Sequence, residues 1–521
     1  MSWNEGYRTD TVYTYGYYRE MNPQEMRFLT LMAGYMPPEV RNACELGYGQ
    51  GVSLNIHAAA ENIEWYGTDF NPAQAGFARE MAEASGAAAH CSAEPFQKFC
   101  ERKDLPEFDY IALHGIWSWI SPENRAAIAH LIDRKLRVGG ALYISYNTAP
   151  GWSAFRPARD LMKLYIDSHD AAGMNILAKV RDSFAFMTRL KEAEPAYFKQ
   201  NPGVEARIDS FKDKDASYLA HEFFNHDWDP VNFQEMATIL GEARMTFVCS
   251  ANPVQLIMGL GMNEAQRKLL ADLGDPVLRE TVQDFIYNTQ FRKDYWIKGP
   301  RPLSQPVRAS LLRAEQIILT TPRDKLAREV KTGIGTVNIS EAALAIFRQV
   351  LADGKVHDIA ELEKAAHEMN QRDNKPEGIE KENLLTLCQA ICVLLAGSQL
   401  AIAQKKQDAL KARPAAEKLN LFIENLAVSG IGINFLASPV IGGGLAISRF
   451  DMLFLLALRR NAKTAQQLAL FARDCLRLAN QHIVEDGKAL TEPDEALAYL
   501  QRQAETFLQD RLGLFKDLLL A

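Results

Sequence analysis

The residues most able to bind a ligand form a glycine-rich stretch near the start of the chain. Glu45 is followed by Gly47, Gly49 and Gly51, with one residue between successive glycines. A tight strand-to-helix turn needs residues that tolerate positive φ, and a backbone without β-carbons lets a ligand approach closely. A dinucleotide site places its third glycine one residue later. Glu45 would repel a pyrophosphate but suits the positive amino group of a methionine moiety, so the pattern favours S-adenosylmethionine over NAD.

Two further stretches lie where a nucleoside site would need them. Asp69 ends the next apolar run, where a carboxylate accepts hydrogen bonds from ribose hydroxyls. The run CSAEPF at 91–96 follows the third predicted strand, and its backbone amides and polar side chains could read the adenine edge. Asp69 could instead cap a helix before Asn-Pro, and a lone glycine turn can be structural. The combined order predicts a cofactor site made of Glu45, Gly47, Tyr48, Gly49, Gly51, Asp69, Phe70, Ser92, Ala93, Glu94 and His114.

A candidate methyl-acceptor pocket follows the fourth predicted strand. His114, Trp117 and Trp119 fall at the carboxyl end of that strand, where open α/β sheets bind substrates. An amine acceptor must lose a proton, since a lysine pKa is about 10.4; histidine could accept that proton, and indole faces could hold the cation. In the alternative, His114 caps the strand and both tryptophans pack under the next helix. The same two alternatives apply to residues that end the fifth strand, namely Tyr146, Asn147 and Trp152.

Two other motifs have ambiguous roles. The run HEFFNH at 221–226 resembles the zinc pattern H-E-x-x-H but is one residue too long, so two histidines five apart cannot share a metal on one helix face. We therefore expect no metal and take Glu222 and His226 as candidates for a lid. The N-terminal tyrosines either fold over the cofactor or form an aromatic arm packed on the sheet; they are Tyr7, Tyr13, Tyr15, Tyr17 and Tyr18.

The elements that would position these residues alternate in type. Between residues 40 and 146, short apolar runs alternate with helical patterns, as in a doubly wound sheet. Asn71-Pro72 and Ser121-Pro122 predict two helix starts. Residues 152–230 read as a helical insertion, after which a helix and a strand return the chain to the sheet, and the catalytic fold closes near residue 252.

The rest of the chain predicts a middle region and a C-terminal half. Residues 253–298 continue with helical segments, and the run KGPRP at 298–302 marks a boundary. The predicted domains are a cofactor-binding domain at 1–252, an overlapping regulatory region at 205–298, and a winged-helix-like, mainly helical domain at 303–521. The fold class is therefore α/β, a Rossmann-like domain with a helical insertion and a helical C-terminal half. Gly442, Gly443 and Gly444 read as a tight connection, because no Lys-Ser/Thr follows them.

Composition restricts the partners. The formal net charge of -7 argues against nucleic acid, which needs a concentrated basic surface. We find no apolar run long enough for a membrane span and no secretory leader, so a cytoplasmic location is expected. The seven cysteines form no C-x-x-C pair, and Cys388 and Cys392 read as buried free thiols. The oligomeric state is not predicted.

Several motifs together resemble bacterial class I methyltransferases that carry a methyltransferase regulatory domain. The likeness covers most of the chain through HGIWSW, LRVGGALYISYNTAPGW, HEFFNHDWDP, FRKDYW and ASPVIGGGLAISRF. It implies a Rossmann-like catalytic domain, a middle regulatory domain and a winged-helix-like C-terminal part. It also implies that Glu45, Gly47, Gly49 and Gly51 form the cofactor loop and that Asp69 is the ribose acid. Tyr48 departs from the family, which commonly has a small residue there.

This resemblance implies a reaction as well as a fold. The family includes protein-lysine N-methyltransferases that act on outer-membrane proteins, so we expect S-adenosylmethionine as cofactor and lysine amines of a protein as acceptor. Extending lysine methylation to this chain is an analogy at family level. Two alternatives remain: methylation of a small molecule, and a regulatory protein that binds S-adenosylmethionine without turnover.

Overall fold

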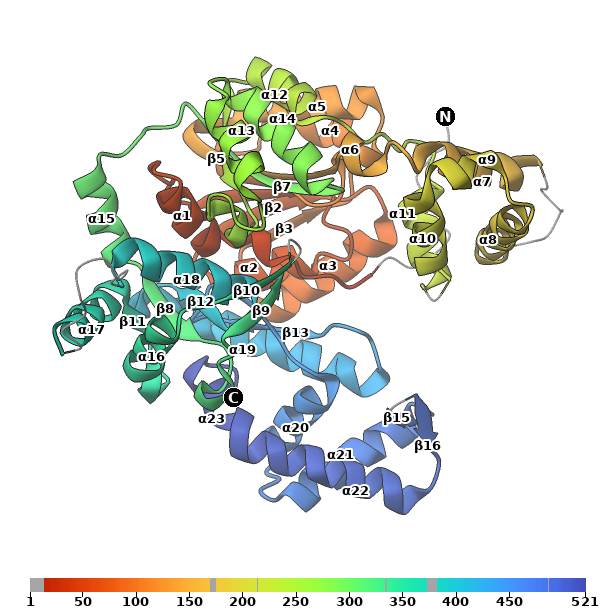
Figure 1. Cartoon of the computed structure of the whole chain (residues 1–521). Helices are drawn as coiled ribbons and strands as arrows, with labels where there is room; N and C mark the ends of the chain where they lie inside the picture. Colours follow the sequence, from red (N-terminus) through yellow and green to blue (C-terminus); the bar gives the residue numbers. More distant parts are fainter. Residues whose placement is uncertain (1–13, 169–174, 213, 333–334, 373–381, 486) are drawn as a thin grey trace.

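The structure, a computed structural model, describes residues 14–168, 175–212, 214–332, 335–372, 382–485 and 487–521. Its centre is a seven-stranded sheet with the order β3-β2-β1-β4-β5-β7-β6. The N-terminal part of the chain builds the sheet, and the C-terminal half lies against one side of it (Figure 1).

The first five strands are parallel and alternate with helices, as the sequence predicted. The strands are β1 (Asn42–Leu46), β2 (Glu64–Thr68), β3 (Ala89–Ser92), β4 (Phe108–Leu113) and β5 (Leu136–Asn147). The intervening helices are α2 (Val52–Ala60), α3 (Pro72–Ser85), α4 (Phe96–Glu101) and α5 (Pro122–Lys135). Both predicted helix starts are confirmed: the Asn71 side chain accepts a hydrogen bond from the Ala73 amide, and the Ser121 side chain accepts one from the Asn124 amide.

We expected the sheet to be complete near residue 252, but the structure contradicts this prediction. After β6 (Met245–Ser250) the chain adds β7 (Phe291–Lys298), which inserts between β5 and β6 and is antiparallel to both. Arg292 and Asp294 in β7 are ion-paired, which allows both charged side chains to be buried. The sequence of β7 therefore lacks the alternation of apolar and polar residues that marks a strand. Between β6 and β7 lie η3 (Pro253–Leu256), α13 (Glu264–Asp272) and α14 (Pro276–Tyr287).

The segment predicted as an insertion is mainly helical, and its described residues contain no strand. It contains α6 (Ala149–Trp152), α7 (Arg156–Ser168), α8 (Ile176–Glu192), α9 (Ala196–Gln200), α10 (Pro202–Ser210) and α11 (Ala216–Phe223). These helices share a small aromatic core that includes Trp152 and Phe155. They project to one side of the sheet (Figure 1). The predicted helix after the insertion is α12 (Phe233–Glu242), and the predicted strand is β6.

The C-terminal half packs onto the sheet domain through a shared core. Residues of α18, such as Ile391, belong to the same hydrophobic cluster as Trp65 of β2 and Tyr143 of β5. A three-stranded antiparallel sheet in this half has the order β11-β8-β12. A short strand, β10 (Gly335–Asn338), is followed by helices α16 (Glu341–Val350) and α17 (Ile359–Arg372), while the winged-helix assignment stays a prediction. Cys388 and Cys392 are buried free thiols, as expected.

The bounds of the remaining elements complete the fold. Before the sheet come η1 (Arg19–Met21) and α1 (Pro23–Met32), and η2 (Trp117–Trp119) follows β4. The C-terminal half contains α15 (Gln305–Arg313), β8 (Gln316–Leu319), η4 (Arg323–Lys325), β9 (Glu329–Thr332), β10 (Gly335–Asn338), α16 (Glu341–Val350), η5 (Leu351–Asp353), β11 (His357–Asp358), α17 (Ile359–Arg372), α18 (Leu384–Ala396), β12 (Leu400–Ala403) and α19 (Lys406–Ser429). It ends with β13 (Phe435–Ser438), β14 (Gly443–Ala446), α20 (Arg449–Arg459), α21 (Ala465–Leu478), β15 (Ile483–Glu485), β16 (Lys488–Leu490), α22 (Pro493–Thr506), η6 (Phe507–Arg511) and α23 (Leu512–Asp517).

The triple glycine lies at a tight hairpin, as expected: Gly442 ends the connection between β13 and β14, and Gly443 and Gly444 are the first residues of β14. Gly442 has a φ of +60°, and a β-carbon there would lie 2.6 Å from Oε1 of Glu61 in the loop after α2. A β-carbon on Gly443 would lie 2.5 Å from the Tyr17 hydroxyl. The glycines therefore allow this hairpin to dock against the sheet domain. None of the helices within the described residues has the length and apolar character needed to cross a membrane.

Candidate functional site

The glycine loop between β1 and α2 has a backbone that only glycine adopts readily. Gly47, Gly49 and Gly51 have φ values of 71°, 57° and 72°. A β-carbon on Gly47 would lie 2.4 Å from Cδ1 of Ile116, and one on Gly51 would lie 2.4 Å from Cβ of Ala78. The loop is thus packed between the segment after β4 and helix α3. Three glycines in left-handed conformations within one turn carry no side chains, so a ligand can approach the backbone of the loop closely.

Asp69 ends β2 and holds the glycine loop from the neighbouring strand. Its Oδ2 accepts a hydrogen bond from the Gly49 amide at 3.0 Å, and its Oδ1 accepts one from the Asn71 amide at 2.9 Å. The helix cap is Asn71, so the capping alternative for Asp69 does not hold. Burial raises the pKa of Asp69 to about 6, although the two amides oppose that shift.

Glu45 is the second acid beside the loop. Its side chain is buried, and Oε2 has no hydrogen-bond partner among the described residues. Burial, and then the charge of Asp69, raises the pKa of Glu45 to about 8. Two adjacent buried carboxyl groups without a counter-charge favour binding of a cationic or hydrogen-bond-donating group.

Tyr48 and the residues after β3 close the far end of this region. The Tyr48 hydroxyl donates to the Ser92 carbonyl at 2.6 Å, which ties the glycine loop to β3. The Ser92 hydroxyl accepts from Arg102, and the Glu94 carboxylate pairs with Lys98 and Arg102. Phe70 and Ala93 are half-buried beside them. The structure thus gathers the predicted cofactor residues at one edge of the sheet, with the Ser92 and Glu94 side chains engaged by Arg102.

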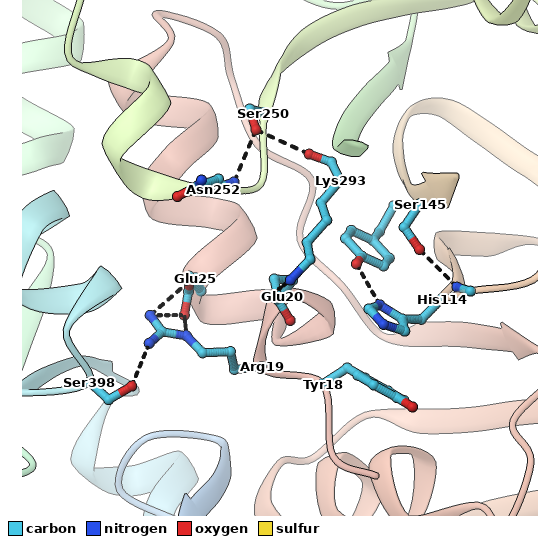
Figure 2. A network of polar contacts seen from close by, with 12 residues as sticks. Tyr18, Arg19, Glu20, Glu25, His114, Ser145, Ser250, Asn252, Lys293 and Ser398 are labelled. Carbon is cyan, nitrogen blue, oxygen red and sulfur yellow. Dashed lines mark hydrogen bonds and ion pairs between the residues drawn. The ribbon is translucent and has the colours of Figure 1, made fainter. Parts of the chain in front are cut away.

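His114 follows β4 and is held on both sides of its ring. Tyr18 stacks on it with ring centroids 3.7 Å apart, and its Nδ1 lies 2.7 Å from the Tyr143 hydroxyl (Figure 2). Burial lowers the pKa of His114 to about 4, although Glu20 opposes the shift. The imidazole is therefore neutral near pH 7, and one ring nitrogen is already bonded. These properties suit positioning better than general-base catalysis.

Three of the N-terminal tyrosines, Tyr15, Tyr17 and Tyr18, pack as an arm on the molecule. Tyr18 covers His114, whereas Tyr17 is buried against His57 and Phe435. Tyr15 contacts Phe77 of α3. Tyr7 and Tyr13 lie outside the described residues. The described part of the run thus bridges the sheet domain and the C-terminal half.

A cavity of about 410 Å³, here called the acceptor cavity, opens beside His114. It lies at the carboxyl ends of β4 and β5, below α11 and the start of β7. Its lining residues are Thr14, Tyr18, His114, Gly115, Trp119, Asn147, Trp152, Asp215, Ser217, Tyr218, His221, Glu222, Gln290 and Phe291. Sequence reasoning named several of these as site residues but not Thr14, Gly115, Asp215, Ser217, Tyr218, Gln290 and Phe291. Of these, Gly115 and Phe291 lie in the motifs HGIWSW and FRKDYW, which carried the resemblance but assigned them no role.

Two residues predicted for this pocket lie elsewhere. Trp117 is fully buried and packs with the residues under α5, with the Arg125 guanidinium over its ring. Tyr146 is also fully buried, and its hydroxyl donates to Oδ2 of Asp294 at 2.8 Å. Neither side chain lines this cavity, so for these two residues the structure favours the packing alternative, whereas Trp119 and Asn147 line the cavity.

Glu222 is the acidic group of this cavity best placed to meet a substrate. Asp215 also lines it, but its Oδ1 accepts two backbone amides as the cap of α11. Within the described part of the chain, no residue donates a hydrogen bond to the Glu222 carboxylate, and burial raises the pKa of Glu222 to about 7. The Trp119 indole donates to the Glu222 carbonyl at 3.1 Å, which fixes α11 over the cavity. His226 lies beyond the end of α11 and is exposed, whereas His221 is buried.

Comparisons with known proteins agree with this geometry. Residues 215–298 match the family model of a predicted methyltransferase regulatory domain. The uncharacterized protein sll1526 of Synechocystis is 33% identical over 99% of each chain. This chain and sll1526 belong to one family. A second member of that comparison, the uncharacterized protein RP789 of Rickettsia prowazekii, is 26% identical over 62% of this chain and 58% of its own length.

The regulatory domain that the sequence resemblance implied is matched by the family model, and the whole chain also shares the fold of a solved bacterial structure. The structure of PKMT2 from Rickettsia typhi in complex with AdoHcy superposes with a TM-score of 0.68 at 16% identity. The match covers 98% of this chain and all of that one. The shared fold therefore extends beyond the sheet to the C-terminal half of this chain.

Proposed function

We propose that this protein is an S-adenosylmethionine-dependent methyltransferase that methylates lysine amines of a protein substrate. The observation that carries the proposal is the acceptor cavity, an aromatic chamber containing the Glu222 carboxylate beside the glycine loop. β1 and β4 are neighbours in the sheet, so the glycine loop after β1 and His114 after β4 share one edge. Cofactor and acceptor sites at the same sheet edge are what methyl transfer requires.

The residues around the glycine loop fit the proposed cofactor. The unpaired oxygen of Glu45 would accept the positive amino group of the methionine moiety, and Asp69 would accept the ribose hydroxyls. The backbone at Ser92, Ala93 and Glu94 would face the adenine. S-adenosylmethionine supplies the methyl group as a sulfonium. Burial raises the pKa of both Glu45 and Asp69 and so disfavours their ionised forms. Contacts with the amino group and the hydroxyls of the cofactor would oppose that shift and stabilise the two carboxylates.

The acceptor cavity supports an amine acceptor on a long alkyl chain. Trp119, Trp152 and Phe291 present aromatic surface that holds both the alkyl stem and the ammonium group. Glu222 then accepts one proton from the ammonium, which leaves a neutral amine with its lone pair free. The aromatic walls favour this step, since removal from water lowers an amine pKa. His114 holds the geometry of this wall together with Tyr18.

A mass measurement tests this proposal. The purified protein is incubated with S-adenosylmethionine and a bacterial protein extract, and tryptic peptides are searched for added methyl groups. We expect the additions at lysine side chains. Addition only to small metabolites would contradict the protein substrate, and tight cofactor binding with no acceptor at all would indicate a regulatory protein without turnover.

A further inference from the structure

A second cavity lies on the opposite side of the wall that bounds the acceptor cavity. It has a volume of about 600 Å³, and we call it the flanking cavity. Tyr18, His114 and Phe291 line both cavities. The remaining walls come from η1, from Lys293 of β7, and from β12, β13 and β14 of the C-terminal half. The two cavities are therefore adjacent chambers between the sheet edge and the two parts of the chain that flank it.

The charges of the flanking cavity neutralise one another. Arg19 makes a two-pronged ion pair with Glu25 at 3.1 Å and also donates to Ser398. Lys293 is ion-paired with Glu20, which outweighs burial and lowers the Glu20 pKa. Figure 2 shows the Glu20–Lys293 pair between Arg19–Glu25 and His114. A small ion would have to break one of these pairs, so the cavity does not select a strongly charged ligand.

The other lining side chains are mostly apolar. They are contributed largely by the C-terminal half and include Leu400, Ile402, Phe435, Ile441, Leu445 and Ala446. Such a surface gains free energy by covering apolar side chains of a ligand. The flanking cavity thus fits an uncharged, partly apolar group.

β12 adds a backbone feature to this wall. Three of its residues, Leu400, Ala401 and Ile402, line the flanking cavity. Within the described residues β12 is at the edge of its sheet, pairing with β8 on one side. An edge strand leaves alternate amide and carbonyl groups outside the ladder, and an extended peptide can bond to them as an added strand. A side-chain cavity beside a strand edge is suited to a polypeptide in extended conformation.

We propose that the flanking cavity binds the extended polypeptide segment next to the methyl-accepting lysine, with an apolar residue of that segment seated among Leu400, Phe435 and Leu445. The proposal rests on the proposed function for its choice of a lysine-containing protein as substrate. Because the two cavities share a wall, the apolar residue lies within a few positions of the lysine. The C-terminal half then selects the sequence around the target, and the sheet edge performs the transfer.

A binding selection tests this proposal without requiring turnover. The probe is a library of peptides of about 11 residues, which span roughly 36 Å when extended. Each peptide has one central lysine, with glycine, leucine, aspartate or lysine at the neighbouring positions. The full-length enzyme is immobilised with S-adenosylhomocysteine, and retained peptides are identified by mass. The variant is Ala446→Arg, which introduces a long charged side chain at an exposed position of the cavity wall. The matched control is Ala265→Arg on the exposed face of α13.

The wild type and Ala265→Arg should enrich peptides with leucine on one side of the lysine. Ala446→Arg should lose that enrichment at least tenfold while its melting temperature stays that of the wild type. N-methylation of the leucine amide should weaken retention, since it removes a strand hydrogen bond. Equal enrichment in Ala446→Arg, no enrichment in the wild type, or selection of aspartate or lysine would overturn the proposal. The proposed function fails separately if the retained peptides gain no methyl group when S-adenosylmethionine is supplied.

Discussion

The glycine loop and the acceptor cavity are built in opposite ways. The loop is a local structure: three glycines within five residues take left-handed conformations, and one carboxylate from the next strand fixes them. The acceptor cavity joins side chains from five separate segments, namely the N-terminal arm, the regions at the ends of β4 and β5, helix α11 with its cap, and the start of β7. A local backbone motif can be recognised in a sequence, whereas a chamber assembled from distant segments depends on the whole fold. Substitutions that disturb the backbone should therefore impair cofactor binding most, and substitutions of single side chains should impair the use of the acceptor most.

The largest effect should come from Gly51→Ala. The new β-carbon would lie 2.4 Å from Cβ of Ala78, at a residue whose φ is +72°. We expect a loss of about 3 kcal/mol in the free energy of unfolding and loss of cofactor binding. Urea denaturation measures the first quantity. Gly76→Ala in α3 is the matched control, because no atom lies within 4 Å of its new β-carbon; it should gain about 0.5–1 kcal/mol. Wild-type stability in Gly51→Ala would contradict the packed loop.

The next effect concerns the proton acceptor of the acceptor cavity. In the wild type, kcat should rise as pH increases through about 7, because the ionised Glu222 accepts the proton. Glu222→Gln should lower kcat roughly 100-fold at pH values above this point and abolish that rise. His114→Asn should lower kcat without moving the pH at which it rises. A pH–rate profile unchanged in Glu222→Gln would remove Glu222 from this role.

The same substitution also tests folding. Burial raises the pKa of Glu222 from 4.5 to about 7, so the folded state binds the proton more tightly than the unfolded state does. The wild type therefore loses stability as pH rises from 4.5 to about 7, and the deficit persists above that range. Glu222→Gln should melt at or above the wild-type temperature in alkaline solution. Lower stability there would show that activity loss reflects unfolding.

Asp69→Ala tests the cofactor side without a backbone change. Loss of charged hydrogen bonds to the ribose should weaken S-adenosylhomocysteine binding by about 1–3 kcal/mol. Equilibrium dialysis measures the change, and Asp104→Ala, at an exposed ion pair with Arg102, should leave affinity unchanged. Equal affinities in the two variants would exclude Asp69 from the site.

The smallest effect separates two neighbouring tryptophans. Trp119→Phe should weaken binding of a lysine side chain by about 0.5–1 kcal/mol, seen as a higher KM. Trp117→Phe should leave KM unchanged and instead lower stability, because Trp117 fills the core under α5. A higher KM in Trp117→Phe alone would reverse the assignment.

The sequence predicted the backbone of the glycine loop and the elements around it well, because their signals are local. Positive-φ glycines, the Asn71 and Ser121 caps and the parallel strands all follow from short stretches. The acceptor side was predicted only in part. Tyr146 and Asn147 are consecutive strand residues and must point to opposite faces, and sequence alone does not say which face meets the substrate.

The sequence did not predict β7 or the full lining of the acceptor cavity, because both depend on contacts that form only in the folded protein. β7 contains Arg292, which is buried by ion pairs with Glu280, Asp284 and Asp294. Glu280 and Asp284 lie in α14, the helix directly before β7, and Asp294 lies in β7 itself. A strand with such neutralised charges at buried positions lacks apolar alternation, so the segment gave no strand signal. Phe291 and Glu222 meet in the acceptor cavity only after β7 enters the sheet and α11 folds over its edge.

The most direct test of the account is calorimetric titration of the purified wild-type protein with S-adenosylhomocysteine, and with NAD in parallel. The structure predicts saturable binding of the sulfur ligand, because the unpaired Glu45 oxygen meets a positive amino group, and no binding of NAD, whose pyrophosphate would face that acid. Binding of NAD, or of neither ligand, would contradict the assignment of the glycine loop as a methyl-donor site.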